Sequence, residues 1–116
     1  MSVVPIDLSP RKRPAVFEPA SLGPLTLRNR IVKAATFEGR TPKGQVTDDL
    51  VAFHAEVARG GVGMTTVAYC AVAPGGRVHR HCAVLDAATV ADFRRLTDAV
   101  HAEGAHVSAQ IGHAGL

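Results

Sequence analysis

The amino-acid sequence predicts an α/β fold in which a parallel sheet is built from strands that alternate with helices. Two segments, residues 47–59 and 86–103, place apolar residues at spacings of three and four, which is the helical period. Three apolar runs, residues 31–35, 62–72 and 106–111, precede, separate and follow these segments. This β-α-β-α-β order favours a parallel sheet with right-handed crossovers. Because 47% of the residues are hydrophobic and only 4% aromatic, we expect a core of Val, Ala and Leu.

We expect residues 1–15 to form an irregular leader and residues 16–116 to form the folded segment. The leader is rich in proline and carries the basic cluster Arg11-Lys12-Arg13, which suits a solvated arm. Gly23-Pro24 before the alternating run Leu25-Thr26-Leu27 predicts a short β-hairpin over residues 25–30. The run over residues 31–35 is then the first strand of the sheet.

Each predicted helix has a start signal and a stop signal. Thr47 is suited to cap the first helix, and Gly60-Gly61 is a natural end for it. Asp86 is the expected cap of the second helix, and Gly104 is its expected stop. Between the helices, the β-branched run over residues 62–72 predicts a strand that is buried on both faces.

Composition and charge exclude several classes of function. The formal net charge is +3, and the basic residues are scattered without interleaved aromatic residues, so we do not expect nucleic-acid binding. No run approaches the ~20 apolar residues of a membrane span, so we do not expect a membrane partner. Cys70 and Cys82 form neither a CxxC motif nor a disulfide framework, and no signal peptide is evident. We therefore expect a cytoplasmic protein.

The series of elements is incomplete as given. Three parallel strands with two helices leave hydrophobic sheet edges uncovered. A doubly wound sheet needs at least one or two more units of this kind, and a closed barrel needs about five. Periodicity alone leaves both architectures open.

Three separated motifs then resemble one family. The stretches FEPASLGPLTLRNRIVKAAT, VTDDLVAFHAEVARGGVGM and AQIGHAG occur in the order and spacing of Old Yellow Enzyme-like NADH:flavin oxidoreductases. The resemblance extends from about residue 16 to residue 116 and covers only the opening segment of the family's fold. It implies the N-terminal part of a (β/α)8 TIM barrel, with about three β-strands and two helices, preceded by a β-hairpin that closes the barrel's other end.

The resemblance also implies where this chain approaches FMN, because ligands of such barrels lie at the C-terminal ends of the strands. Ala35, Thr36 and Phe37 follow the first strand and are expected to contact the flavin partly through backbone groups. Ala35 occupies the family's usual Pro position, and Phe37 its Cys or Thr position. Tyr69 ends the second strand, where the family has a small residue. Gln110 ends the third, and its amide complements the donor and acceptor of a flavin's pyrimidine edge. A purely structural role remains open for each.

Several other polar residues remain without an assigned role. Arg40, Lys43 and Arg77 follow the first two strands, where they either shape a substrate entrance or are solvated loop charges. His79 and His81, with Cys82, have a spacing that suits zinc, but no carboxylate or third ligand group accompanies them, so we expect no metal site. Of the other histidines, His54 and His101 lie within helices as packing or surface residues, and His113 stays unassigned.

By resemblance, the function is that of an FMN-dependent oxidoreductase in which NAD(P)H reduces the flavin. The family passes hydride to an activated alkene or a related small molecule. Its catalytic residues come from later strands, so we expect none in this fragment and expect the 116-residue chain alone to be inactive. Two alternatives remain open. One is a non-catalytic truncated product that needs a partner chain, with a homo-oligomer possible; the other is a metal-dependent barrel hydrolase that uses His79 and His81.

Overall fold

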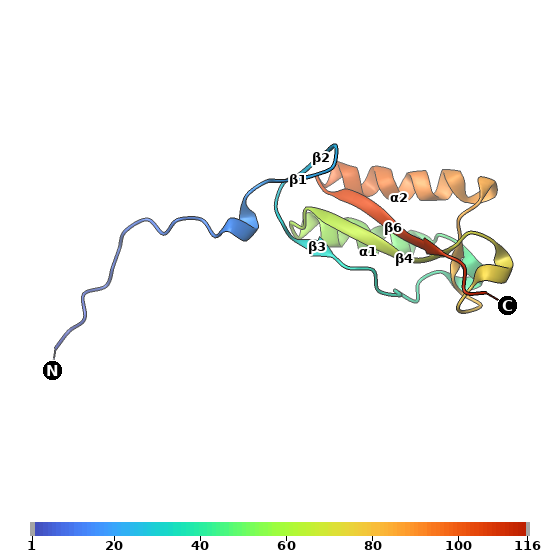
Figure 1. The fold of residues 1–116 in the computed structure, drawn as a ribbon, viewed down its shortest axis with the longest axis horizontal. Coiled ribbons are helices and arrows are strands. Elements are labelled where there is room, and N and C mark those ends of the chain that lie inside the picture. The colour runs from blue at the N-terminus through green and yellow to red at the C-terminus, as the bar shows by residue number, and fades with distance from the viewer. Residues whose placement is uncertain (1, 116) are drawn as a thin grey trace.

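A computed structural model describes residues 2–115 and divides them into an extended N-terminal arm and a compact α/β body (Figure 1). Residues 2–14 contain neither helix nor strand, and they run away from the body in every view. Four apolar side chains of this arm are more than four-fifths exposed: Val3, Val4, Ile6 and Leu8. The arm therefore contributes nothing to the core.

After a single 3-10 turn at Ala15–Phe17, the chain forms an antiparallel hairpin of β1 (Ala20–Leu22) and β2 (Leu25–Leu27). It starts earlier than the expected range of residues 25–30, because Gly23, at a φ of +55°, forms the turn and Ala20 pairs with Leu27. Arg28 follows the hairpin and donates hydrogen bonds to the carbonyls of Val62 and Glu103 at 3.0 and 2.8 Å. It also donates to the carbonyl of Ala58. One guanidinium thus fixes the hairpin against the C-terminal ends of both helices.

The sheet is centred on β4 (Met64–Ala71), to which three other strands pair in parallel. β6 (His106–Gly112) follows β4 along its whole length. β3 (Val32–Lys33) pairs with the start of β4 and β5 (Ala83–Val84) with its end, so both lie on the edge opposite β6. The two-residue β3 is shorter than the predicted run over residues 31–35, because the chain leaves the sheet after Lys33. The sequence did not predict β5.

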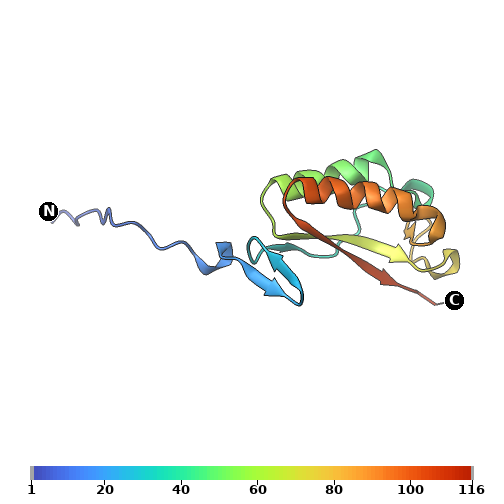
Figure 2. The same ribbon diagram turned by 90° about the horizontal axis from the view of Figure 1, so that it is seen from above.

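Helices α1 (Asp48–Arg59) and α2 (Val90–Ala102) lie side by side on one face of this sheet (Figures 1 and 2). The Thr47 hydroxyl accepts a hydrogen bond from the Leu50 amide at 3.2 Å, which confirms the predicted cap. Asp86 instead caps a short 3-10 turn that leads into α2. Within residues 2–115, no helix is both long and apolar enough to cross a bilayer.

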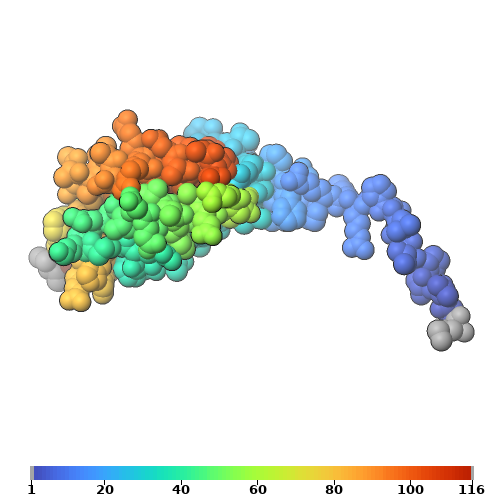
Figure 3. Space-filling view, turned by 180° about the vertical axis from the view of Figure 1, so that it is seen from behind, coloured from blue at the N-terminus to red at the C-terminus, as the bar shows by residue number. Residues whose placement is uncertain are grey.

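The core lies between the helices and the sheet. The helices contact each other directly, and a space-filling view shows them packed together over the rear of the molecule (Figure 3). The buried side chains include Leu50, Val67, Leu96 and Val100, which matches the expected aliphatic core. On the sheet, Thr65 contacts α1, so by strand alternation Thr66 faces away from the helices. Its hydroxyl lies 2.8 Å from that of Ser108 on β6.

Candidate functional site

The C-terminal ends of the parallel strands and their following loops gather at one end of the sheet. Ala71 of β4 pairs with Gly112 of β6, and the Val72 amide donates to the Gly112 carbonyl at 3.2 Å. Beyond the strands, the Ala114 amide donates to the Gly76 carbonyl at 2.9 Å. This end lies opposite the hairpin (Figure 1). It is the edge at which ligands bind in parallel α/β proteins.

Tyr69 and Gln110 lie on the same face of the sheet at this end. A Cβ built on Gly112 would lie 2.7 Å from the Tyr69 hydroxyl oxygen, so the absence of a side chain at Gly112 makes room for the tyrosine ring. Gln110 alternates in register with Ser108 and Gly112, and it is exposed. Both residues therefore occupy the face that the helices leave uncovered.

Ala35, Thr36 and Phe37 form an exposed irregular segment after β3. Phe37 is 44% exposed, and its ring centroid lies 5.7 Å from that of His79. Phe37 thus contacts the loop that follows β4 and brings two strand ends together. Among residues 2–115, no hydrogen bond joins this segment to Gln110.

The loop after β4 carries the histidines that suggested a metal site. The ring centroids of His79 and His81 are 5.2 Å apart. His81 Nδ1 lies 3.1 Å from the Lys43 amide nitrogen, and its Nε2 lies 3.0 Å from Arg80 Nε. Desolvation, and then the charges of Arg80 and His79, lower the pKa of His81. Among residues 2–115, no three His, Cys, Asp or Glu side chains are grouped to hold a metal ion.

The basic residues of these loops make local contacts. Arg40 forms an ion pair with Asp49 at 2.7 Å and lies 4.9 Å from the centre of the Phe53 ring. Arg77 donates from Nε to the carbonyl of Pro74 at 2.9 Å. These contacts are those of loop charges at the surface, which was one of the two interpretations of the sequence.

A buried ionic cluster underneath the Ala35–Phe37 segment was not predicted from the sequence. Glu38 Oε1 lies 3.0 Å from Lys33 Nζ and 3.1 Å from His54 Nε2, and the Glu38 and His54 side chains are 3% and 0% exposed. Burial acts to raise the pKa of the Glu38 carboxyl, but contacts with His54 and Lys33 outweigh it, so its pKa lies below the ordinary value. The sequence did carry a signal: His54 lies on the apolar stripe of α1, four residues from both Leu50 and Ala58.

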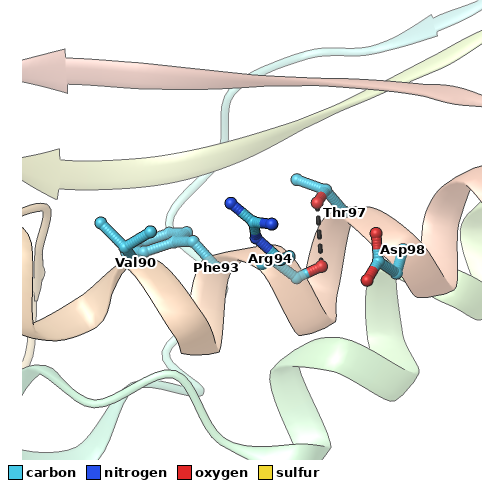
Figure 4. A pocket seen from close by; sticks show the side chains of 5 residues that line it. All are labelled: Val90, Phe93, Arg94, Thr97 and Asp98. Atoms are coloured by element: carbon cyan, nitrogen blue, oxygen red, sulfur yellow. Dashed lines mark hydrogen bonds between the residues drawn. The ribbon is translucent and has the colours of Figure 1, made fainter.

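A hollow along α2 is separate from these strand ends. It is lined by Val90, Phe93, Arg94, Thr97 and Asp98, and Figure 4 shows their side chains in a row along the helix. An adjoining hollow shares Phe93 and Thr97 and reaches Val107 and Ala109 of β6. Within the described residues β6 pairs only with β4, so these hollows follow the open side of the sheet.

Residues 15–116 match the family described as NADH:flavin oxidoreductase / NADH oxidase. The chain belongs to this family. It is 74% identical over 103 residues to the 4,4'-dithiodibutanoate disulfide reductase of Rhodococcus erythropolis, covering 89% of this chain and 26% of the relative. It is 42% identical over 100 residues to a metal reductase of Desulforamulus reducens, covering 86% of this chain and 15% of the relative. The chain thus spans about a quarter or less of the length of these curated relatives.

Solved structures agree with the fold. A 2-naphthoyl-CoA reductase complex matches with a TM-score of 0.81 at 25% identity, over 88% of this chain and 16% of that chain. A morphinone reductase in complex with tetrahydroNAD matches with a TM-score of 0.76 at 25% identity, over 87% of this chain and 28% of that chain. An Old Yellow Enzyme from Pichia sp. AKU4542 has a similar fold, with a TM-score of 0.77 at 22% identity, over 87% of this chain and 28% of that chain. The predicted family and the predicted partial (β/α)8 barrel are therefore confirmed, with β3, β4 and β6 as the three parallel strands that the sequence predicted.

Proposed function

We propose that this chain supplies one side of the flavin site of an FMN-dependent oxidoreductase that uses NAD(P)H. In this proposal Ala35, Thr36 and Phe37 approach the flavin through backbone groups, while Tyr69 and Gln110 approach it from β4 and β6. The observation that carries the proposal is the shared, uncovered face of Tyr69 and Gln110 at the C-terminal ends of parallel strands, in a chain that belongs to a flavin oxidoreductase family.

The residues present fit a planar, hydrogen-bonding ring. Gln110 offers an amide donor and an acceptor at an exposed strand end, and a flavin's pyrimidine edge needs both. Tyr69, laid across Gly112, presents a flat aromatic surface beside it. When bound, FMN supplies the hydride chemistry, and this chain's side chains bind and orient it. Phe37 offers no thiol or hydroxyl to tune the flavin, so its contribution is limited to backbone and ring contacts.

The substrate is proposed to be an activated alkene or a related small molecule. A disulfide is a second candidate, because the relative at 74% identity is named for the reduction of 4,4'-dithiodibutanoate. The two candidates differ in the bond that is reduced, C=C or S–S, so parallel assays distinguish them. For the enzyme we propose a cytoplasmic setting, which the two buried free cysteines, Cys70 and Cys82, support.

The first experiment is a titration of the purified chain with FMN. Tyr69 is its single tyrosine and it has no tryptophan, so intrinsic emission reports on one proposed contact residue. We expect no tight binding, because most of a barrel's ligand-binding loops are absent from these 116 residues. Size-exclusion chromatography of the same sample tests the alternative in which the chain acts only with a partner chain, since that alternative requires an assembly.

The decisive experiment is a chimera in which this chain replaces the equivalent segment of the Rhodococcus erythropolis reductase. The 74% identity over 103 residues makes the two segments exchangeable without large packing changes. We expect a yellow flavoprotein that reduces an activated alkene or a disulfide with NAD(P)H. In that chimera Gln110→Leu should weaken FMN binding by about ten-fold or more. A chimera that folds without binding flavin would refute the proposed function.

A further inference from the structure

The exposed segment Ala35–Phe37 is held at both ends by a buried ion pair. Lys33, at the end of β3, and Glu38, directly after Phe37, join at 3.0 Å between Nζ and Oε1. Their side chains are 18% and 3% exposed, whereas residues 34–37 between them are all exposed. The short loop that carries the proposed flavin contacts is thus closed by a contact that water scarcely reaches.

The ion pair is itself anchored to two other elements. Lys33 Nζ also donates to the Thr66 carbonyl of β4 at 3.1 Å. Glu38 Oε1 lies 3.1 Å from His54 Nε2 of α1, and His54 Nδ1 lies 2.8 Å from the Thr65 hydroxyl. Placing the ring proton on Nε2 lets Nδ1 accept from the Thr65 hydroxyl, and Nε2 lies beside the Glu38 carboxylate at 3.1 Å without forming a hydrogen bond to it. The cluster therefore ties the loop to the rigid part of the fold.

Stability alone does not explain such a cluster. Replacing a buried ion pair by apolar side chains of similar volume is often neutral or stabilising, since desolvation offsets the attraction between the charges. An ion pair does select one conformation of the loop, because Lys33 and Glu38 reach each other in only one arrangement of the residues between them. A clamp of this kind at the base of a ligand-binding segment holds that segment in one place.

We infer that Glu38 is a positioning residue, which through Lys33 and His54 fixes the Ala35–Phe37 segment where it meets the flavin. This inference rests on the proposed function. It assigns a role to Glu38 and His54, neither of which is exposed enough to touch a ligand at the strand ends. Their effect on the flavin is exerted through the position of the backbone they hold.

The first test uses the full chain and needs no flavin. Two variants are compared with wild type: Glu38→Gln, and the double variant Lys33→Met/Glu38→Met, which replaces the clamp by apolar side chains that pack. The ¹⁵N order parameters of residues 34–39 should fall from about 0.85 in wild type to below about 0.6 in the double variant, while the hydrogen exchange of α1 and β4 is retained. The ¹⁵N signals of His54 should report the Nε2-protonated form in wild type and a mixture of forms in Glu38→Gln.

Asp49→Asn is the matched control. It removes a carboxylate from the exposed Arg40–Asp49 pair beside the same loop and leaves the buried cluster intact. We expect wild-type order parameters for residues 34–39 and wild-type His54 signals in this variant. If the order parameters of residues 34–39 in the double variant equal those of wild type, the inference is wrong.

The second test places the same variants in the chimeric reductase. The double variant should retain the fold, bind FMN at least about ten-fold more weakly and shift the visible spectrum of the flavin that does bind. A loosened loop with unchanged FMN affinity and spectrum would overturn the positioning role and leave the proposed function standing. A wild-type chimera that binds no FMN would instead reject the proposed function.

Discussion

Replacing Lys33 by Met should leave the Glu38 carboxylate buried without its cationic partner. Glu38 is 3% exposed, and after the substitution His54 Nε2, 3.1 Å away, is its remaining polar neighbour within the cluster. Removing one partner of a buried ion pair typically costs about 3–5 kcal/mol. Lys33 is 18% exposed, so water has partial access to the vacated site. We therefore expect the lower end, a loss of about 3 kcal/mol in the free energy of unfolding at pH 7.

The pH dependence of this loss provides a sharper test than its size. In wild type the pKa of Glu38 lies below its ordinary value of 4.5, so its stabilising contribution is present above that pH and is lost as the pH falls through the folded-state pKa. Without Lys33, fewer contacts oppose the effect of burial, so the folded-state pKa of Glu38 lies higher in the variant than in wild type. Protonation of Glu38 then removes the unpaired buried charge, and the loss in the free energy of unfolding of the variant should shrink to about 1 kcal/mol near pH 4.

Urea unfolding of wild type and Lys33→Met, followed by far-UV circular dichroism at pH 7 and near pH 4, measures both quantities. Asp49→Asn serves as the control, because an exposed pair contributes about 1 kcal/mol or less. A Lys33→Met deficit that stays constant or grows as the pH falls would refute the assignment of Glu38 as a buried carboxylate that needs its lysine.

Three further predictions concern the strand ends and the helix cap. Gly112→Ala should displace Tyr69, because the tyrosine hydroxyl would lie 2.7 Å from the new Cβ. We expect the fluorescence emission of this single tyrosine to change and the free energy of unfolding to fall by about 1 kcal/mol. Unchanged emission would contradict the contact. Burial, with smaller effects of Glu38 and Cys82, raises the pKa of Cys70 to about 11. Cys70 should therefore react slowly with thiol reagents at pH 8, and rapid labelling of the folded chain would disprove the burial of its thiol. The free energy of unfolding should decline as the pH rises from 9.0 toward about 11, because the unfolded chain loses the thiol proton first. Thr47→Ala should lower the free energy of unfolding by about 1 kcal/mol in urea titrations, because the cap on α1 is lost; no change would mean that solvent replaces it.

The order of elements could be predicted from the sequence because its signals are local. Thr47 caps α1, and Gly104, at a φ of +81°, follows the end of α2, as the sequence predicted. The apolar runs predicted the bounds of β4 and β6 to within about two residues, because a buried parallel strand has a continuous apolar sequence. The hairpin was misplaced because the turn at Gly23 lies in its middle and not before it.

The polar contacts depend on which elements become neighbours, and no local pattern specifies that. Arg28 reaches carbonyls that are 30 to 75 positions away in the chain, and Glu38 meets His54 only because α1 packs against β4, the strand that pairs with β3. The space at Gly112 is filled by a side chain from another strand.

The amino-acid sequence by itself thus determined the alternation of strands and helices and, through its motifs, the family. The tertiary structure alone decided how the buried charges under the Ala35–Phe37 segment are paired and how Tyr69 lies across β6. The physical reason is that periodicity and caps act over one or two turns of chain, whereas ion pairs and ring contacts require the register of parallel strands and the packing of helices on them.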